Sequence, residues 1–232
     1  MTMGGIQGGW REPAVALRDC TFVYPDGRVV LQQVNWVLAP GSFAVLSGPT
    51  GSGKTTILRV LLRLVRPSTG SVYLLGEDLL SMPARRRPKL RRRIGVVAQD
   101  LSLLVDRTVE QNLRLALAVR GKRGRTGRRR AAQLLQEAHL MHRRHDYPVQ
   151  LSGGERQRLA MARAAAGFPD LILADEPTAH LDKENSDDIV QWLGRLQTAG
   201  STVIVVTHAP EQFALLRGAQ FYRLDHGCVR EN

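Results

Sequence analysis

The 232-residue chain contains only two cysteines, Cys20 and Cys228, and neither belongs to a Cys-x-x-Cys pair or a cluster with histidine. We therefore expect both thiols to be reduced and structural, and we assign them no chemistry. No apolar run approaches the roughly 18 to 20 residues that a membrane-spanning helix needs. Residues 1–9 also lack the charged and apolar regions of a secretory signal. These absences favour an intracellular chain without a membrane span.

Lysine is scarce as well, since four lysines stand against 29 arginines. The net charge of +12 comes from two segments, Arg85–Arg93 and Arg120–Arg130, which each carry seven basic residues and no acidic one. Without them the net charge falls from +12 to −2, so the rest of the chain is nearly neutral. Such segments fit a solvated surface, an anionic membrane surface or acidic partner, or nucleic acid, in that order of preference.

One of the few lysines, Lys54, completes a specific motif. The stretch Gly48-Pro49-Thr50-Gly51-Ser52-Gly53-Lys54-Thr55 fits G-x-x-x-x-G-K-[ST], the phosphate-binding P-loop. It lies between a predicted buried strand, 43–47, and a predicted helix, 55–65, which is the context that the motif needs. Glycines allow successive backbone N–H groups to converge on a phosphate at the helix N-terminus. We expect Lys54 to reach the β- and γ-phosphates and Thr55 to ligate Mg²⁺.

Alternating strands and helices predict one α/β domain, and 43% hydrophobic content suffices for one good core, perhaps with a subdomain. Residues 1–13 read as a disordered tail, and Gly121, Gly124 and Gly127 interrupt helical spacing. The predicted strands are 15–24, 29–38, 43–47, 71–75, 94–97, 171–174 and 201–206, followed by a hairpin of 220–224 and 228–230. The predicted helices are 55–65, 109–118, 128–140, 156–166 and 187–197.

The pentapeptide Leu151-Ser152-Gly153-Gly154-Glu155 precedes an alanine-rich helical stretch. Ser152 and Glu155 have the spacing of a capping box, which would satisfy the N–H groups of the first helical turn. Two successive glycines fit that interpretation poorly, because each destabilises a helix unless something approaches the backbone closely. We therefore expect this helix N-terminus to be a second site that binds phosphate.

Polar residues follow the buried strands where an α/β fold binds its ligand. Asp175 and Glu176 end one such strand, so Asp175 is expected to hold Mg²⁺ through its water shell and Glu176 to take a proton from an attacking water. His208 emerges from a neighbouring strand and is placed at the γ-phosphate. Gln99 ends a third strand, where it would orient a water or ligate Mg²⁺. Tyr24 is a candidate for stacking on adenine, although alone it fits an ordinary strand aromatic better.

With these motifs in order, the chain resembles the ATP-binding subunit of ABC transporters over about residues 14–230. The resemblance implies an α/β P-loop NTPase fold of ABC type, with a mixed or parallel sheet core, an N-terminal antiparallel β region and an inserted α-helical subdomain. The core would cover 14–97 and 169–230, and the subdomain about 98–168. The implied nucleotide-binding residues are Tyr24, Gly48, Pro49, Thr50, Gly51, Ser52, Gly53, Lys54, Thr55, Thr56, Ser152, Gly153, Gly154, Glu155 and Asp182. The implied catalytic residues are Glu176, His208, Gln99 and Lys54, and the implied metal ligands are Thr55, Gln99 and Asp175.

The resemblance also implies the cofactors and partners: ATP, Mg²⁺, a second copy packed head to tail, and an integral membrane subunit that places the chain on the inner face of the cell membrane. The segment Leu103–Leu113 resembles the cell-division branch (FtsE type), whose partner would be an FtsX-like permease. Val105 and Gln111 depart from that pattern, as do Ala98 and His180. An exporter of lipoproteins, peptides or macrolides is the alternative, and a soluble protein acting on nucleic acid is a weaker one.

Overall fold

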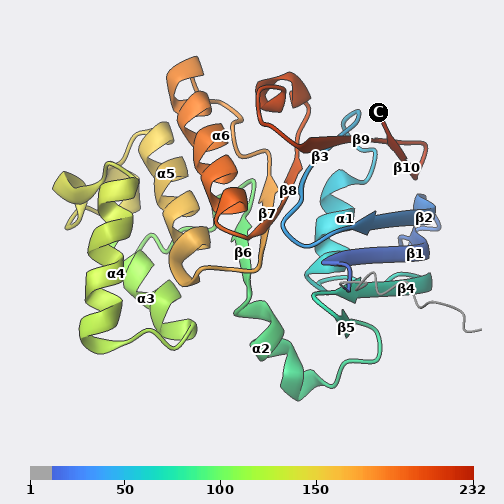
Figure 1. Ribbon diagram of the computed structural model, residues 1–232, viewed down its shortest axis with the longest axis horizontal. Helices are drawn as coiled ribbons and strands as arrows, with labels where there is room; N and C mark the ends of the chain where they lie inside the picture. The colour runs from blue at the N-terminus through green and yellow to red at the C-terminus, as the bar shows by residue number, and fades with distance from the viewer. Residues whose placement is uncertain (1–11) are drawn as a thin grey trace, which may run out of the picture.

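The computed structural model describes residues 12–232, so most of the predicted tail, 1–13, lies outside the described residues. Two sheets form the framework (Figure 1). The larger has the order β10-β9-β3-β8-β7-β6, in which β3, β6, β7, β8 and β9 pair in parallel and β10 pairs antiparallel with β9. Its strands are β3 (Phe43–Ser47), β6 (Ile94–Val97), β7 (Leu171–Asp175), β8 (Thr202–Val206), β9 (Ala219–Asp225) and β10 (Cys228–Glu231).

The smaller sheet is antiparallel and has the order β2-β1-β4-β5. Its strands are β1 (Val15–Val23), β2 (Val29–Leu38), β4 (Thr69–Leu74) and β5 (Glu77–Asp78). A mixed core sheet, an N-terminal antiparallel region and inserted helices are the predicted ABC-type architecture, which is confirmed. No helix among residues 12–232 combines the length and the apolar character that crossing a membrane requires.

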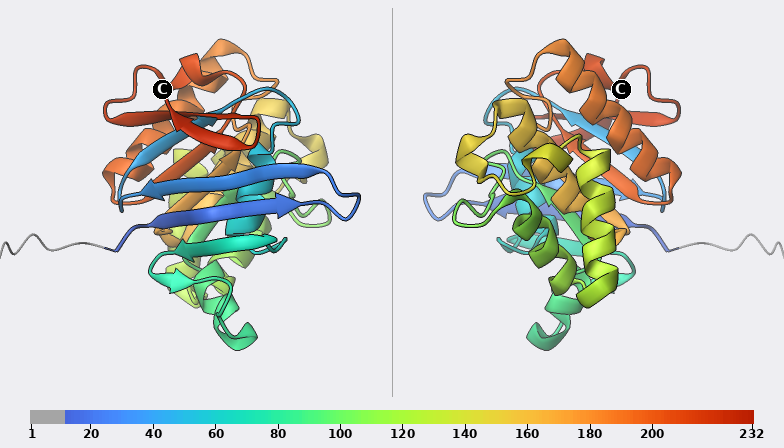
Figure 2. Two further views of the ribbon diagram at one scale, coloured as in Figure 1. Left: turned by 90° about the vertical axis from the view of Figure 1, so that its right-hand side faces the viewer. Right: turned by 90° about the vertical axis from the view of Figure 1, so that its left-hand side faces the viewer.

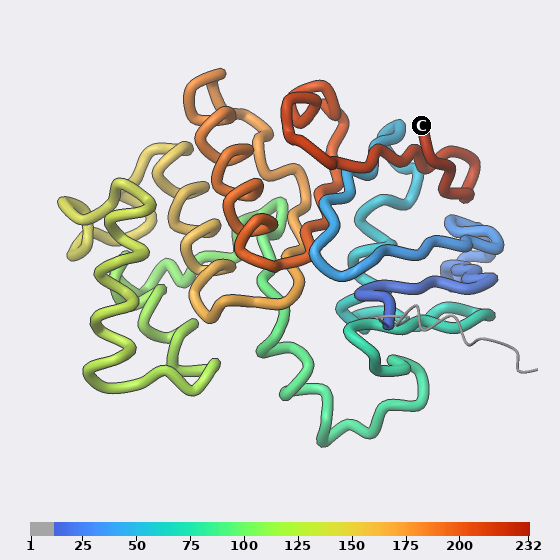
Figure 3. Tube along the Cα trace, viewed as in Figure 1, coloured from blue at the N-terminus to red at the C-terminus, as the bar shows by residue number. Residues whose placement is uncertain are grey.

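The helices divide between the two sides of the core sheet. They are α1 (Lys54–Leu61), α2 (Arg87–Arg91), α3 (Val109–Val119), α4 (Gly124–Glu137), α5 (Gly153–Ala164) and α6 (Lys183–Thr198), with short 3₁₀ turns at Ala84–Arg86, Met141–Arg143, Pro148–Gln150, Ala165–Gly167 and Pro210–Phe213. Figure 3 shows that most of the helical side of the molecule comes from the chain between β6 and β7, with α6 beside it. A separate subdomain over about 98–168 stays a prediction.

Strand periodicity explains why two hydrophobic clusters form. Successive side chains of a strand point to opposite faces, so Phe43 and Val45 of β3 join one cluster with α3, α4, α5 and α6. Ala44 and Leu46 join the other cluster, together with α1 and the antiparallel sheet. Every residue of β3, β7 and β8 is buried, as expected for strands covered on both faces. These covered strands place their polar ends at one edge.

Several predicted boundaries are wrong for identifiable reasons. Helix α4 begins at Gly124 rather than Arg128 and includes Gly127. That glycine is required by packing and does not break the helix, since a Cβ there would meet the Lys122 carbonyl oxygen at 2.5 Å. Helix α6 begins at Lys183 rather than about 187, because the Asp182 side chain accepts a hydrogen bond from the Asn185 N–H and caps it.

The two cysteines are free, as predicted. Cys20 is buried in β1, and this burial raises the pKa of its thiol to about 11. A thiol with such a pKa stays protonated at neutral pH and is a poor nucleophile. Burial in β1 therefore supports a structural role for Cys20.

Candidate functional site

The P-loop joins the buried strand β3 to helix α1, as predicted. Gly48 and Gly53 both have positive φ angles, 153° and 105°. A Cβ at Gly48 would lie 2.3 Å from the Leu224 carbonyl oxygen, and one at Gly53 would lie 2.6 Å from Val30 Cγ1. A side chain at Gly48 would displace the backbone of Leu224, and one at Gly53 would displace the Val30 side chain and strain the positive φ. The loop is thus held tightly between β2, β9 and α1.

The interior of this loop contains polar groups that are prepared for a phosphate. The buried Lys54 ammonium donates to the carbonyl oxygens of Gly48 at 2.8 Å and Pro49 at 3.0 Å. The Ser52 hydroxyl is buried without a hydrogen-bond partner among residues 12–232. Within the same described part, the backbone N–H groups of residues 53–55 also have no protein acceptor. Buried donors normally have partners, so this cradle fits an anion.

A cavity of about 230 Å³ adjoins the cradle and is lined by Tyr24 and Arg28. The Tyr24 hydroxyl lies 3.5 Å from the Thr56 hydroxyl, and this hydrogen bond is the main cause that lowers the pKa of Tyr24. The Arg28 guanidinium lies 5.0 Å from the centre of the Tyr24 ring. The aromatic ring is therefore beside the P-loop, as expected for adenine stacking. Arg28 was not predicted, because a single arginine in a turn carries no motif.

A second cleft of about 460 Å³ brings together Thr55, Gln99 and Asp175, the three predicted metal ligands. Burial is the main cause that raises the pKa of Asp175, and the negative charge of Glu176 raises it further. The Thr55 hydroxyl and the Lys54 ammonium act in the opposite direction. A bound cation would relieve the cost of ionising Asp175.

The three predicted ligands supply a hydroxyl, an amide and one carboxylate, and Asp100 and Ser102 also line the cleft. Oxygen ligands of this kind suit Mg²⁺, which usually binds through one or two carboxylates, water and substrate phosphates. Residues 12–232 contain no group of three or more His, Cys, Asp or Glu side chains that could hold a metal by themselves. The donors therefore fit a Mg²⁺ ion that enters with the phosphates of its nucleotide.

Glu176 and His208 meet at the carboxyl ends of β7 and β8. The Glu176 N–H donates to the Val206 carbonyl oxygen at 2.8 Å, which fixes the residue beside the end of β8. Its carboxylate lies 2.8 Å from Nδ1 of His208 and accepts from the Thr207 hydroxyl at 3.2 Å. Glu176 also has a positive φ of 49°, a backbone strain found often at functional sites. The structure thus brings together the predicted base and the predicted histidine.

The pentapeptide 151–155 forms the N-terminus of α5. Ser152 and Glu155 make the predicted capping box, since the Glu155 N–H donates to the Ser152 hydroxyl at 3.2 Å and the Ser152 N–H donates to the Glu155 carboxylate at 2.8 Å. This Ser152 N–H is the main cause that lowers the pKa of Glu155, and Arg143 lowers it further. The contact with Arg143 was not predicted, because no spacing rule relates the two residues.

The two glycines of this turn differ in whether packing explains the absence of a side chain. A Cβ at Gly154 would lie 2.8 Å from the Asn185 Oδ1, so close packing against α6 excludes a side chain there. A Cβ at Gly153 would meet nothing within 4 Å. Packing within residues 12–232 therefore explains Gly154 but leaves Gly153 unexplained. Asn185 also donates to the Asp182 carboxylate at 2.8 Å, so it ties this turn to the loop before α6.

The two glycine-rich turns do not meet within one copy of the chain. Helices α1 and α5 both begin on the upper side of Figure 1, with α6 and the core strands between them. Of the two clefts that contain P-loop residues, neither is lined by any residue of 151–155. The P-loop, Gln99, Asp175 and Glu176 thus gather at one sheet edge, whereas 151–155 presents a separate surface.

Comparison with known proteins gives a consistent family. The ABC transporter family profile matches residues 31–179. The cell division ATP-binding protein FtsE of Streptococcus pneumoniae serotype 2 (strain D39 / NCTC 7466) is 38% identical over 203 residues, which cover 88% of each chain. FtsE of Escherichia coli (strain K12) is 40% identical over 80% of this chain and 83% of its own. The lipoprotein-releasing system ATP-binding protein LolD 1 of Rhodopirellula baltica (strain DSM 10527 / NCIMB 13988 / SH1) is 42% identical over 82% of this chain and 87% of its own.

Solved structures agree in fold. The dimeric bacterial ABC transporter cassette MJ0796 superposes with a TM-score of 0.85 at 36% identity, covering 94% of this chain and 97% of its own. A dimeric post-hydrolysis state of the same cassette, bound to ADP and Pi, gives the same values. The chain therefore belongs to the ABC transporter family, in which it is an ATP-binding and ATP-hydrolysing subunit similar to the cell division ATP-binding proteins.

Proposed function

We propose that two copies of this chain hydrolyse ATP at sites shared between them, with the P-loop of one copy facing residues 151–155 of the other. Gly153 carries this proposal, because its missing side chain has no explanation within residues 12–232. A phosphate approaching from a second copy would need that open space above the α5 N-terminus. The dimeric state of the similar cassette MJ0796 supports the same arrangement.

In each shared site, Lys54 and the P-loop N–H groups would bind the phosphates and Tyr24 would stack on adenine. Thr55 and Asp175, with Gln99, would hold a Mg²⁺ ion, whose charge would stabilise negative charge that develops on the phosphate oxygens. Glu176 would then accept the proton of the attacking water. Its carboxylate contacts His208, which would hold it beside the phosphate site.

We further propose that closing and opening of this dimer drive a separate membrane subunit in cell division, from the inner face of the membrane. The FtsE relatives support this role, and the local structure after Gln99 supports it too. Gln111 completes a capping box with Thr108, so it replaces the usual glutamate without loss of the cap. Val105, which replaces a proline, is 61% exposed and available to a partner.

A chromosomal Glu176→Gln substitution tests the cellular role. A role in cell division predicts that cells with this substitution are elongated and that their lipoproteins are normally located. Retained lipoproteins in cells of normal length would overturn it in favour of lipoprotein export, the second candidate that the LolD 1 relative supports. Co-purification of the wild-type chain from detergent-treated membranes tests the partner directly, because division predicts an FtsX-like permease in the complex.

A further inference from the structure

The basic segment Arg120–Arg130 is not one uniform surface. Arg120 is turned inward, where it donates to the carbonyl oxygens of Ile94 at 2.8 Å and Arg92 at 3.2 Å. Arg130 pairs with Glu137 at 2.8 Å. Arg120 therefore joins the end of α3 to β6, whereas the Arg130 pair lies within α4. The solvated-surface interpretation fails for both arginines.

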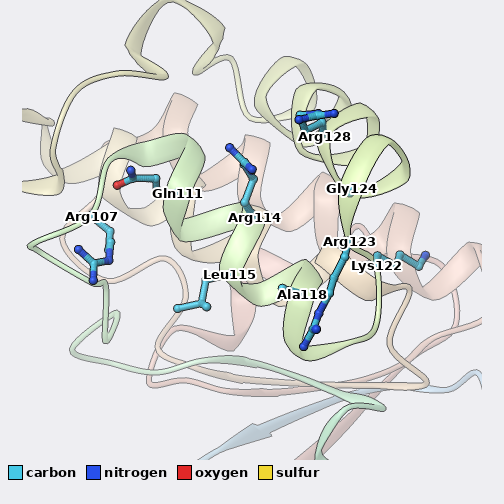
Figure 4. Close-up of a pocket in the computed structure, with 10 residues that line it drawn as sticks. Arg107, Gln111, Arg114, Leu115, Ala118, Lys122, Arg123, Gly124 and Arg128 are labelled. Carbon is cyan, nitrogen blue, oxygen red and sulfur yellow. The ribbon is translucent and has the colours of Figure 1, made fainter.

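Other cations gather around a hollow of about 460 Å³ between α3 and α4 (Figure 4). We call it the basic hollow, and define it by Arg107, Arg114, Arg123, Arg128 and Leu115. Arg107 is 3.4 Å from the Asp106 carboxylate, and Arg114 is 3.9 Å from that of the half-buried Glu110. Both arginines are exposed, and such surface pairs stabilise little.

Arg123 and Arg128 have no carboxylate within 4.0 Å in the described part of the chain. No acidic side chain lines the basic hollow, although Lys122 does. Helix α4 also begins at this point with no acidic residue in its first turn. The charges of Arg123 and Arg128 are therefore left uncompensated, and an anionic ligand would complement them.

Apolar side chains lie beside these cations. Leu115 lines the basic hollow and is 49% exposed, and Val119 one turn further along α3 is 56% exposed. No aromatic side chain lines it, so it lacks the stacking surface that single-stranded nucleic acid commonly uses. Cations next to exposed aliphatic side chains instead match the boundary between lipid headgroups and acyl chains.

The basic hollow lies away from the sheet edge where the P-loop, Asp175 and Glu176 gather. In Figure 1 the α4 N-terminus and α2, which contains part of the other basic segment, lie on the lower side, whereas α1 and α5 begin on the upper side. The left-hand and right-hand views of Figure 2 keep this separation. A flat anionic surface below would therefore meet both basic segments without covering the surface where a second copy is proposed to bind.

We propose that the basic hollow binds the phosphate groups of anionic phospholipids and holds the chain against a membrane. This contact is independent of the membrane subunit and of ATP. Each arginine near an anionic membrane strengthens binding by roughly fivefold. The arginines Arg114, Arg123 and Arg128 together should therefore contribute on the order of 100-fold to vesicle affinity.

The test is flotation of the purified chain with phosphatidylglycerol vesicles and with phosphatidylcholine vesicles at one ionic strength. We expect binding only to the anionic vesicles, and a loss of about 100-fold in affinity for the triple variant Arg114→Gln, Arg123→Gln, Arg128→Gln. The matched control is Arg195→Gln, Arg217→Gln, Arg230→Gln. It removes the same charge from exposed arginines outside the basic hollow, and it should lose no more than about threefold.

Equal losses in the two triple variants would overturn the proposal, because diffuse charge would then explain binding. A duplex DNA fragment that binds as tightly as the anionic vesicles, and that also loses affinity in the first variant, would overturn it in favour of a general polyanion site. Unchanged ATPase activity and Tm of both variants confirm that they are folded. Because flotation requires no ATP, the proposal can fail while the proposed nucleotide site stands.

Discussion

The carboxylate of Glu176 lies 2.8 Å from Nδ1 of His208, across the neighbouring ends of β7 and β8. This distance is that of a hydrogen bond, so the two side chains hold each other where the P-loop and Asp175 also converge. The Glu176 side chain is only 13% exposed, whereas that of His208 is 65% exposed. His208 is therefore the partner that can turn towards a bound nucleotide.

Glu176→Gln should reduce kcat for ATP hydrolysis by at least about 100-fold, because an amide cannot accept the proton of the attacking water. ATP binding should persist, since the P-loop is unchanged. A steady-state phosphate-release assay measures the loss. Glu211→Gln makes the same change at an exposed residue and should retain wild-type turnover. Hydrolysis by Glu176→Gln at the wild-type rate would exclude Glu176 as the base.

Asp175→Asn should stabilise the nucleotide-free chain. Burial raises the pKa of Asp175 above its ordinary 3.8, so the folded state holds its proton to a higher pH than the unfolded state does. Stability should then fall as the pH rises above 3.8 towards the folded pKa. The amide removes this penalty, and each kcal/mol gained raises Tm by about 2–4 °C.

Thermal unfolding between pH 4 and 8, without nucleotide or Mg²⁺, measures this effect. Asp175→Asn should show the higher Tm near neutral pH, and the difference should shrink as the pH is lowered. It should also lose the part of the stabilisation by Mg²⁺-ATP that depends on Mg²⁺, because the P-loop is unchanged. A lower Tm for Asp175→Asn at pH 7 would mean that ionised Asp175 stabilises the empty fold.

Tyr24→Ala should raise the KM for ATP by about tenfold, because stacking of a base on an aromatic ring contributes about 1–3 kcal/mol. Tyr24→Phe keeps the ring and loses only the hydroxyl contact to Thr56, so its KM should change less than about twofold. Initial rates over a range of ATP concentrations separate the two variants. Equal KM values for Phe and Ala would show that the hydroxyl, rather than the ring, binds ATP.

Arg163 of α5 should position the segment that follows Gln99. Its guanidinium donates to the carbonyl oxygens of Leu101 and Ser102, two consecutive residues with positive φ angles of 60° and 44°. Such backbone costs about 1–3 kcal/mol per residue and persists only when its surroundings hold it. Arg163→Lys replaces a planar fork by a single ammonium, which cannot bond both carbonyls in the same way.

We expect Arg163→Lys to lower kcat about tenfold with less than a threefold change in KM, because a shift of Gln99 by about 1 Å affects the reacting groups more than the P-loop. Arg195→Lys is the control, since Arg195 is exposed on α6. A purely structural role would lower Tm and leave kcat per folded molecule unchanged, which would contradict the positioning role.

Much of the fold follows from local sequence signals. The strands 29–38, 43–47 and 94–97 have their predicted bounds, because apolar runs between turn residues define both ends. The start of α4 could not be predicted from sequence, because arginines and two glycines occupy its first turns. Its buried apolar side chains are Ala131, Leu134 and Leu135, which all lie further along the helix. Tertiary packing therefore decides that helix, and its intrinsic propensity does not.

The residues of the site also fall into those that local sequence predicts and those that only the folded chain brings together. Lys54, Asp175 and Glu176 could be predicted, because motif spacing and strand ends determine where they lie. Arg28, Arg143 and Arg163 could not, because their roles depend on partners that chain folding brings near. Arg163, for example, contacts Ser102 and Leu101, which precede it in the chain by 61 and 62 positions. No local sequence pattern marks such a pair.

The shared site can be tested through Gly153→Asp, because the open space at Gly153 accommodates a side chain without disturbing the fold. An aspartate in the first turn of α5 is compatible with the helix dipole. In a closed dimer, however, it would place a carboxylate against the phosphate held by the other copy.

The most direct measurement is the molar mass by light scattering of Glu176→Gln and of Glu176→Gln/Gly153→Asp, each with Mg²⁺-ATP. We predict that Glu176→Gln has twice the chain mass of 25.7 kDa, whereas the double variant stays at 25.7 kDa. ATP affinity of the double variant should remain within about threefold, since its P-loop is intact. A double variant that dimerises as fully as Glu176→Gln, or a Glu176→Gln chain that stays monomeric at saturating ATP, would contradict a site shared between two copies.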